Sequence, residues 1–237
     1  MRIQRLAEAL VEEGHTVDVI TYHLGKSSKN LPFKVFRIAN VFYYNRVSAG
    51  PSFSKLFVLN PMLVHTLLKI GKTGDYDIIH GHHIEGVMVA SAARVMGLNL
   101  PIVYDAHTLV GSELLDYGPA IGASIKRFLG RFLDHFFARR ADSVIAVTDE
   151  IKDEFVTHDS QPADRIHVIS NGIEEDFILR AEKARREYAA CIEKENVIAG
   201  KHAPIFMYAG NTAAYQGIDL MLKAFALVAQ QLPDAQL

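Results

Sequence analysis

The sequence predicts an α/β protein with a doubly wound parallel sheet, and two patterns support this fold class. Short runs rich in β-branched residues recur along the chain, and several are apolar throughout, which suits strands buried on both faces. Stretches of helical periodicity separate these runs, and such alternation requires parallel strands with right-handed crossovers. At 237 residues, 49% of them hydrophobic, the chain is long enough to bury a sizeable core.

The first predicted element is a helix. In residues 2–13 the apolar side chains recur at helical spacing, and Gly14 follows where a C-terminal cap belongs. A doubly wound sheet places a central strand before its first helix, and the sequence holds no such run there. We therefore expect a sheet that lacks its first strand. Because burying about six apolar side chains contributes roughly 1.5–3 kcal/mol each, we expect the chain alone to be poorly stable.

The remaining elements alternate along the chain. The predicted strands are VDVITY, KVFRI, DIIH, PIVYDA, SVIAV, RIHVIS and PIFMYA. The predicted helices between them cover residues 55–70, 85–96, 121–140 and 150–158, and a last helix follows in GIDLMLKAFALVAQQL. The aromatic-rich stretch 40–60 is long for a connection in an α/β domain, which favours a functional loop.

A charge-dense, helix-prone stretch at residues 179–203 is typical of a linker between domains. It divides the chain into an N-terminal Rossmann-like domain at 1–178 and the first β-α unit of a second domain at 204–237. That second domain is only begun when the sequence ends.

Composition excludes several classes of function. A net charge of -2 gives no basic surplus for nucleic-acid binding. The single cysteine, Cys191, and the lack of any zinc-type cysteine and histidine spacing favour a reducing compartment and no structural metal. No apolar run reaches the roughly 18 residues of a membrane span, and no signal peptide is evident. We expect a cytoplasmic protein.

Six segments in this order resemble glycosyltransferase family 4: GHTVDVIT, DIIHGHH, PIVYDAH, ADSVIAVTDE, RIHVISNGIEEDF and PIFMYAGNTAAYQGIDLMLKAF. The resemblance implies the GT-B architecture, with an acceptor-side and a donor-binding Rossmann-like domain. It further implies transfer of a sugar from a nucleotide-diphosphate sugar to an acceptor, with retention of configuration and no permanently bound cofactor. Glycolipids, polysaccharides and lipid-linked precursors are the acceptor classes that we expect.

Polar residues follow several predicted strands, where ligands of open α/β sheets collect: His80, His82, His83, Asp105, His107, Asn171 and Gly172. The resemblance places His107 beside the transferred sugar, which makes it the candidate catalytic residue. The alternative is a structural histidine whose hydrogen bonds are all made within its own loop. His80 and His82 share one strand face, and we discount a metal site in favour of a substrate contact or a solvent-exposed strand end.

Two further segments next to these strands carry alternative interpretations. His82 and Glu85 are candidates for the acceptor side of the cleft, at the start of the following helix. Asn171 and Gly172 have the chemistry of a tight turn, and a hinge toward the second domain is a secondary interpretation.

The donor side departs from the family pattern. The resemblance implies an arginine and a lysine that face the donor diphosphate in the first turn of the second domain, and here Asn211 and Gln216 stand at those positions, beside Gly210 and Gly217. Either amides, backbone N–H groups and the helix N-terminus at Gly217 bind the donor, or catalytic competence has been lost. We favour the first interpretation.

Residues 121–140 predict an amphipathic basic helix, with phenylalanines and leucines at helical spacing. It favours either peripheral contact with an anionic membrane or a core-facing helix with a solvated basic side.

Two other functions remain open for the chain, namely a non-catalytic sugar-nucleotide or partner-binding protein and a GT-B sugar-nucleotide epimerase. A dinucleotide oxidoreductase is disfavoured because no GxGxxG follows a strand.

Overall fold

The computed structural model describes residues 2–25, 30–45, 54–116, 122–158, 160–173, 175–194, 204–210 and 216–237. The chain divides into two compact units, Met1–Asn171 and Gly172–Leu237, and each is described by itself. Among the described residues, no helix combines the length and the apolar character needed to cross a bilayer.

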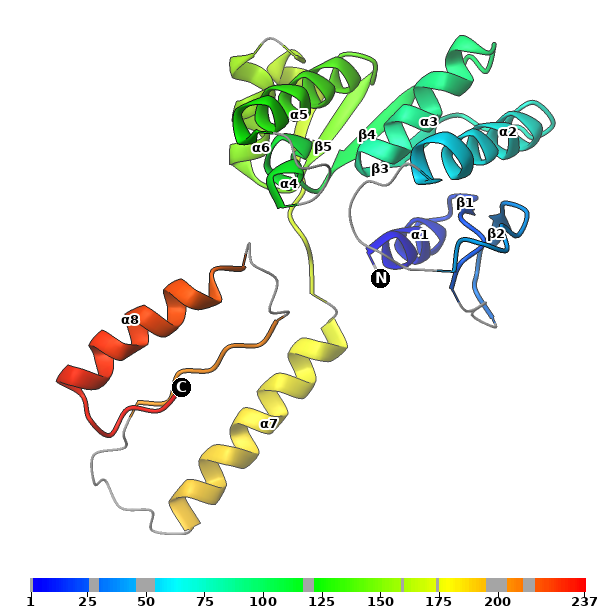
Figure 1. The fold of residues 1–237 in the computed structure, drawn as a ribbon. Helices are drawn as coiled ribbons and strands as arrows, with labels where there is room; N and C mark the ends of the chain where they lie inside the picture. The colour runs from blue at the N-terminus through cyan, green and yellow to red at the C-terminus, as the bar shows by residue number, and fades with distance from the viewer. Residues whose placement is uncertain are drawn as a thin grey trace. The chain divides into compact units, whose positions relative to one another are not determined.

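The first unit opens with a helix and a small sheet (Figure 1). Helix α1 covers Arg2–Glu12, and Gly14 follows with a positive φ of 90°, as its predicted capping role requires. Strands β1 (Asp18–Thr21) and β2 (Lys34–Arg37) then pair in parallel. A short π-helix, η1 (Lys55–Leu59), leads directly into α2 (Asn60–Gly71). The predicted loop at 40–60 is therefore helical at its end, and residues 46–53 within it lie outside the described chain.

A second sheet has four parallel strands in the order β3-β4-β5-β6. The strands are β3 (Ile79–His82), β4 (Ile102–Ala106), β5 (Ser143–Ala146) and β6 (Ile166–Val168). The helices between them are α3 (His83–Val95), α4 (Val110–Asp116), α5 (Ala123–Ala138) and α6 (Asp149–Thr157), and the short 3-10 turn η2 (Ala163–Arg165) precedes β6. The predicted α/β class and parallel pairing are confirmed.

Among the described strands the two sheets are separate, because β1 pairs with β2 alone and β3 with β4 alone. In a doubly wound sheet the first strand lies between these two neighbours. No described strand lies between β1 and β3.

The main core lies between the four-stranded sheet and its helices. Tyr104 and Ile102 of β4, Val144 of β5, Val87 of α3 and Phe155 of α6 are fully buried there. Apolar strands covered on both faces are the expected pattern for parallel sheets. This core fixes the carboxyl end of β4, where several of the predicted site residues lie.

Helices α4 and α5 contact each other at two glycines. A Cβ added to Gly130 would lie 2.5 Å from the Cα atom of Gly111, so neither position has room for a side chain. Asp134, 1% exposed, accepts hydrogen bonds from the backbone N–H groups of Val110 and Gly111 and caps the start of α4. Burial raises the pKa of Asp134 to about 6, although these two bonds oppose that shift. Helix α4 was not predicted, because its cap is 24 residues away from Val110 in the sequence.

The second unit contains α7 (Glu175–Lys194) and α8 (Ile218–Gln231). Of the predicted linker at 179–203, residues 179–194 belong to α7, and residues 195–203 lie outside the described residues. The strand predicted in PIFMYA is wrong, since only an isolated bridge between Ile205 and Gln236 forms there. A strand needs a neighbour along its length, and Ile205 and Met207 stay 75% and 87% exposed.

We predict that Gly130→Ala destabilises the first unit by about 1–3 kcal/mol, because the added methyl group overlaps the α4 backbone. The midpoint of urea unfolding, followed by circular dichroism, measures the effect. Gly122→Ala is the matched control, since nothing lies within 4 Å of a Cβ at Gly122. Equal midpoints for the two variants would contradict the close helix contact.

Candidate functional site

The carboxylate of Asp105 is the centre of a cluster at the carboxyl end of β4. Asp105 is fully buried, and His82 of β3 is its neighbour in the strand register. His80 lies on the same face of β3 as His82, since residues two apart share a face. His107 comes two residues after Asp105, just past the end of the strand. The parallel pairing of β3 and β4 therefore brings together four of the predicted site residues.

Three imidazoles surround this carboxylate. The Nδ1 atom of His82 lies 3.1 Å from Asp105 Oδ2, and His80 Nε2 lies 3.5 Å from the same oxygen. The Nδ1 atom of His107 lies 3.3 Å from Asp105 Oδ1. The rings also stack, with centroid distances of 4.4 Å between His80 and His82 and 5.5 Å between His82 and His107.

Arg2 contributes a cation from the start of α1. Its NH2 atom lies 3.2 Å from Asp105 Oδ1, and its NH1 atom donates to Asn171 Oδ1 at 2.5 Å. No sequence pattern predicts this contact, because Arg2 occupies an ordinary position in a helical segment. The predicted site residue Asn171 thus joins the cluster through Arg2.

The pKa values of Asp105 and His107 are both lowered, for different physical reasons. Burial favours the neutral acid of Asp105, but His80, His82, His107 and Arg2 outweigh it and lower the pKa of the carboxyl. Burial lowers the pKa of His107 to about 4, against the opposing effect of Asp105, and Arg2 adds to the lowering. At neutral pH an ionised carboxylate therefore lies beside a neutral His107, which can both donate and accept a hydrogen bond.

His83 forms a second network beside the first. It begins α3 with a φ of 60°, which is uncommon for a residue other than glycine. Its Nδ1 atom lies 2.7 Å from Glu85 Oε2, and its Nε2 atom lies 3.2 Å from Glu113 Oε2. Thr108 donates to Glu113 Oε1 at 2.8 Å and closes the network.

The two carboxylates make His83 a cation. Burial alone would lower its pKa, but the hydrogen bonds to Glu113 and Glu85 outweigh it and raise the pKa of His83 to about 10. Glu85, which was predicted with His82 as a candidate for the acceptor side, contacts His83 through its carboxylate. Glu113 and Thr108 were missed in the sequence, since both lie on the α4 side of the network.

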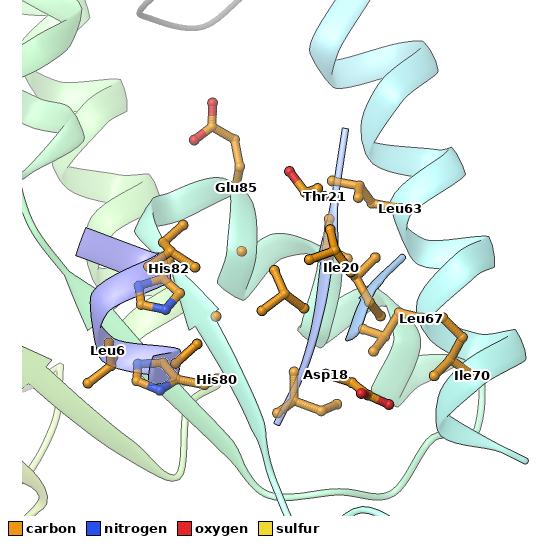
Figure 2. A pocket seen from close by; sticks show the side chains of 18 of the residues that line it. Leu6, Asp18, Ile20, Thr21, Leu63, Leu67, Ile70, His80, His82 and Glu85 are labelled. Carbon is orange, nitrogen blue, oxygen red and sulfur yellow. The ribbon is translucent and has the colours of Figure 1, made fainter. Parts of the chain in front are cut away.

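A cavity of about 1130 Å³ opens beside these residues. Figure 2 shows His80 and His82 of β3 near Leu6 of α1, with Ile20 of β1 on another side. His107 and Glu85 also line the cavity, so the predicted acceptor residues share one space. This volume exceeds the roughly 300–1,000 Å³ of typical small-molecule sites, so a sugar would fill only part of the cavity.

The candidate donor residues all belong to the second unit. Gly217 precedes α8 with a positive φ of 69°, so the first turn of that helix follows a glycine as predicted. Gln216 and Gly210 are described in the same unit, whereas Asn211 lies outside the described residues. Gly172 is the first residue of this unit.

At the Asp105 cluster, the guanidinium of Arg2 would compete with a bound metal ion. The ligand atoms of His80, His82 and Asp105 lie within 4.8 Å of one another, which is close enough for one ion. The guanidinium of Arg2, however, already lies within hydrogen-bonding distance of both oxygens of Asp105. A metal ion would have to displace this cation, so the geometry gives no support to metal chemistry.

Comparison with known proteins identifies the family. Residues 1–177 match the family described as Glycosyltransferase Family 4, which is most of the chain. The chain belongs to glycosyltransferase family 4. Its predicted motifs from GHTVDVIT to RIHVISNGIEEDF all lie within the matched residues.

Two curated relatives of this family 4 chain are D-inositol 3-phosphate glycosyltransferases. The protein from Pseudarthrobacter chlorophenolicus is 28% identical over 99% of this chain and 54% of its own length. The protein from Kribbella flavida is 25% identical over 98% of this chain and 53% of its own length. The chain thus spans about half the length of these relatives.

Solved structures show the same fold. Sucrose-phosphate synthase from Thermosynechococcus elongatus matches with a TM-score of 0.64 at 19% identity, over 96% of this chain and 53% of that protein. A glycosyltransferase from Rickettsia africae matches with a TM-score of 0.53 at 18% identity, over 96% of this chain and 54% of that protein. The predicted GT-B architecture is confirmed at the level of the fold.

We predict opposite pH dependences of stability for the two perturbed histidines. His107 has a lowered pKa, so the unfolded chain binds its proton first, and stability falls as the pH drops from about 6.5 to about 4. His83 has a raised pKa, so its contribution is complete below about pH 6.5 and is lost as the pH rises toward about 10. Urea unfolding of His107→Gln and His83→Gln across this range measures both slopes.

The expected difference between wild type and His107→Gln changes by on the order of 2–3 kcal/mol between about pH 6.5 and 4. His15→Gln changes an exposed histidine and is the control. The same slope in both site variants would contradict the assignment of a neutral His107 and a cationic His83.

Proposed function

We propose that the first unit is the acceptor-side domain of a glycosyltransferase that moves a sugar from a nucleotide-diphosphate sugar to an acceptor. The observation that carries the proposal is the neutral His107 beside the ionised Asp105, at the carboxyl edge of a parallel sheet and in a cavity of about 1130 Å³. Family membership supports the reaction class. The chain spans about half of its relatives' length, so the activity belongs to this proposal.

His107 has the properties of a group that hydrogen-bonds a sugar hydroxyl in the transition state. Its ring is neutral near pH 7 and lines the cavity. Its Nδ1 atom lies 3.3 Å from Asp105 Oδ1 without a hydrogen bond, and its Nε2 atom lies 3.4 Å from Nδ1 of His82. Breaking the sugar–phosphate bond leaves a cationic sugar, and the nearby Asp105 carboxylate would stabilise positive charge. The resemblance to the family further favours retention of configuration.

The leaving diphosphate needs hydrogen-bond donors in the second unit. Gln216 supplies an amide, and Gly217 precedes the N-terminus of α8, where backbone N–H groups point outward. We therefore propose amide and backbone donors for the diphosphate, together with Asn211. This keeps the donor a nucleotide-diphosphate sugar without the cations that the family pattern implies.

We propose a phosphorylated polyol as the acceptor, in place of a polysaccharide. The names of the two curated relatives support this choice, since both act on D-inositol 3-phosphate. Lys55 and Arg37 line the cavity and offer positive charge for a phosphate, whereas the charge of His83 is compensated by Glu85 and Glu113. A non-catalytic binding role is the alternative for a chain of half the relatives' length.

We predict that the chain binds D-inositol 3-phosphate and that Lys55→Ala weakens binding about tenfold, through loss of a charged contact to the phosphate. Isothermal titration calorimetry measures the affinity, with inositol as the unphosphorylated ligand. Lys69→Ala, which changes an exposed lysine on α2, is the matched control.

His107→Ala should reduce acceptor-dependent release of nucleoside diphosphate about 10²–10³-fold, by analogy with lost oxyanion donors.

Three outcomes separate the candidate functions. Binding of the phosphorylated ligand without any transfer would favour the non-catalytic role. Equal affinity for inositol and its phosphate would contradict the proposed acceptor. Turnover of a nucleotide sugar without an acceptor, with change at the sugar ring, would favour an epimerase.

We also propose that α5 contacts an anionic membrane surface on the cytoplasmic side. Leu133 and Phe137 pack against the core, whereas Phe128 and Phe132 are 74% and 53% exposed. The predicted core-facing arrangement thus describes only part of this helix. Basic residues flank the exposed phenylalanines, and Arg127, Phe128, Arg131 and Phe132 share one depression of the surface. Exposed aromatic and basic side chains on one helix suit the interface of an anionic bilayer.

We predict that the double substitution Phe128→Ser and Phe132→Ser reduces binding to anionic vesicles at least about tenfold, since two exposed apolar side chains that would enter the bilayer interface are lost. Sedimentation with phosphatidylserine-containing vesicles at low and moderate salt measures it. Val95→Ser, at an 86% exposed position on α3, is the control. Wild-type protein that stays in the supernatant would contradict the membrane contact.

A further inference from the structure

A second depression, of about 840 Å³, lies along α5 and shares no lining residue with the cavity at the Asp105 cluster. Its lining comes from residues between 124 and 140 and from His158, which caps the end of α6. Four arginines and two histidines contribute to this lining, and no carboxylate is among the described residues that do. The fork of N–H donors in arginine matches phosphate oxygens, so this α5 depression has the chemistry of an anion site.

The lining forms two rows along the helix, because residues four apart are neighbours on a helix surface. The basic row consists of Arg127, Arg131, His135 and Arg139. The aromatic row beside it consists of Phe128, Phe132 and Phe136. From its first to its last arginine, the basic row extends over about 18 Å of helix.

Residues of α6 and its C-cap hold two arginines of the basic row in place. The NH2 atom of Arg131 lies 2.9 Å from Glu154 Oε1 and 2.6 Å from His158 Nε2. The NH2 atom of Arg139 donates to the carbonyl oxygen of His158 at 3.3 Å. Among the described residues no hydrogen bond engages NH1 of Arg131, so this group has donors for a ligand. A guanidinium that is already held loses less conformational freedom when it binds.

The aromatic row gives the α5 depression an apolar side. The rings of Phe132 and Phe136 stack with a centroid distance of 5.6 Å. The guanidinium of Arg140 lies 3.5 Å from the centroid of Phe136, as a cation–π contact, at the end of the row. Cationic and apolar surfaces thus run side by side along one helix, which suits a ligand with an anionic head and a hydrocarbon chain.

The charge of the basic row favours a dianion. Glu154 pairs with Arg131 and compensates one of the three arginine charges in the row, so two positive charges remain. A phosphomonoester carries about two negative charges near neutral pH, and a phosphodiester carries one. A phosphomonoester also offers three terminal oxygens, which suits several arginine forks.

We propose that the α5 depression is a headgroup site for lipids that carry a phosphomonoester. The phosphate binds to the basic row, and the first part of the acyl chains packs on the aromatic row. This inference rests on the proposed membrane contact of α5 and names the lipid class that the contact selects.

A metal ion is a weaker candidate for the same place. The ligand atoms of His135, Glu154 and His158 lie within 4.8 Å of one another. Arg131 already contacts both Glu154 and His158, so an ion would have to displace this guanidinium and would bind among several arginines.

The test compares phosphatidylcholine vesicles that contain either phosphatidic acid, a phosphomonoester, or phosphatidylglycerol, a phosphodiester. Phosphatidylglycerol is used at twice the molar fraction, so that the surface charge is equal. We expect sedimentation of the whole chain to show at least about tenfold tighter binding to phosphatidic acid, because only a discrete site distinguishes equal surface charges.

Variants of the basic row should remove this preference. Arg127→Gln, at an exposed position, should weaken binding to phosphatidic acid at least about fivefold more than binding to phosphatidylglycerol. Arg131→Lys keeps the charge but lacks the planar fork, so it should lower the preference as well. Lys126→Gln is the matched control, since it removes one charge from α5 outside the depression and should weaken both interactions equally.

Soluble ligands separate a lipid from a free phosphate. Dioctanoyl phosphatidic acid, below its micelle-forming concentration, should bind at least about tenfold more tightly in calorimetry than glycerol 3-phosphate, which lacks the chains. Equal affinities would overturn the lipid assignment. Equal binding to both vesicle types would also overturn the headgroup site, while it would leave the membrane contact of α5 in place. Binding of the soluble lipid without any vesicle binding would support the site and contradict the membrane contact.

Discussion

The ionised carboxylate of Asp105 is fully buried, and the site depends on the groups that compensate its charge. An isolated buried carboxylate is unfavourable, so its position requires cations and donors close by. His80 and His82 come from β3, His107 follows β4, and Arg2 comes from α1. One charge thereby ties the first helix to the carboxyl edge of the four-stranded sheet, across a cavity that would otherwise separate them.

A second consequence is that neighbouring histidines carry different charges. His107 is neutral because burial and the nearby Arg2 outweigh Asp105, whereas His83 is cationic because Glu85 and Glu113 outweigh burial. Sugar transfer separates positive charge on the sugar from negative charge on the leaving group, so a site with both kinds of residue suits it. The close packing of Gly81 against Gly86 brings the start of α3, and with it His83, directly onto β3.

Much of the fold was predictable, because periodicity and β-branched runs report burial directly. Strands β1 to β6 and helices α1, α2, α3, α5 and α6 all lie within or close to the predicted segments. The failures share one cause, which is dependence on distant partners. The run PIFMYA has strand composition but no neighbour along its length, and α4 is capped by Asp134 from another helix. Which side chains of α5 are buried and which are exposed likewise depends on the side of this helix that packs against α4.

The sequence alone determined the family and the α/β class, because motifs and hydrophobic patterns are local properties of the chain. It also predicted that His80, His82, Asp105 and His107 gather at one sheet edge, since parallel strands end together. The tertiary structure alone decided the partners: Arg2 with Asp105, Glu85 with His83, and the unpaired edges of β1 and β3. Ion pairs and burial depend on distances between segments far apart in the chain, and no local pattern encodes these.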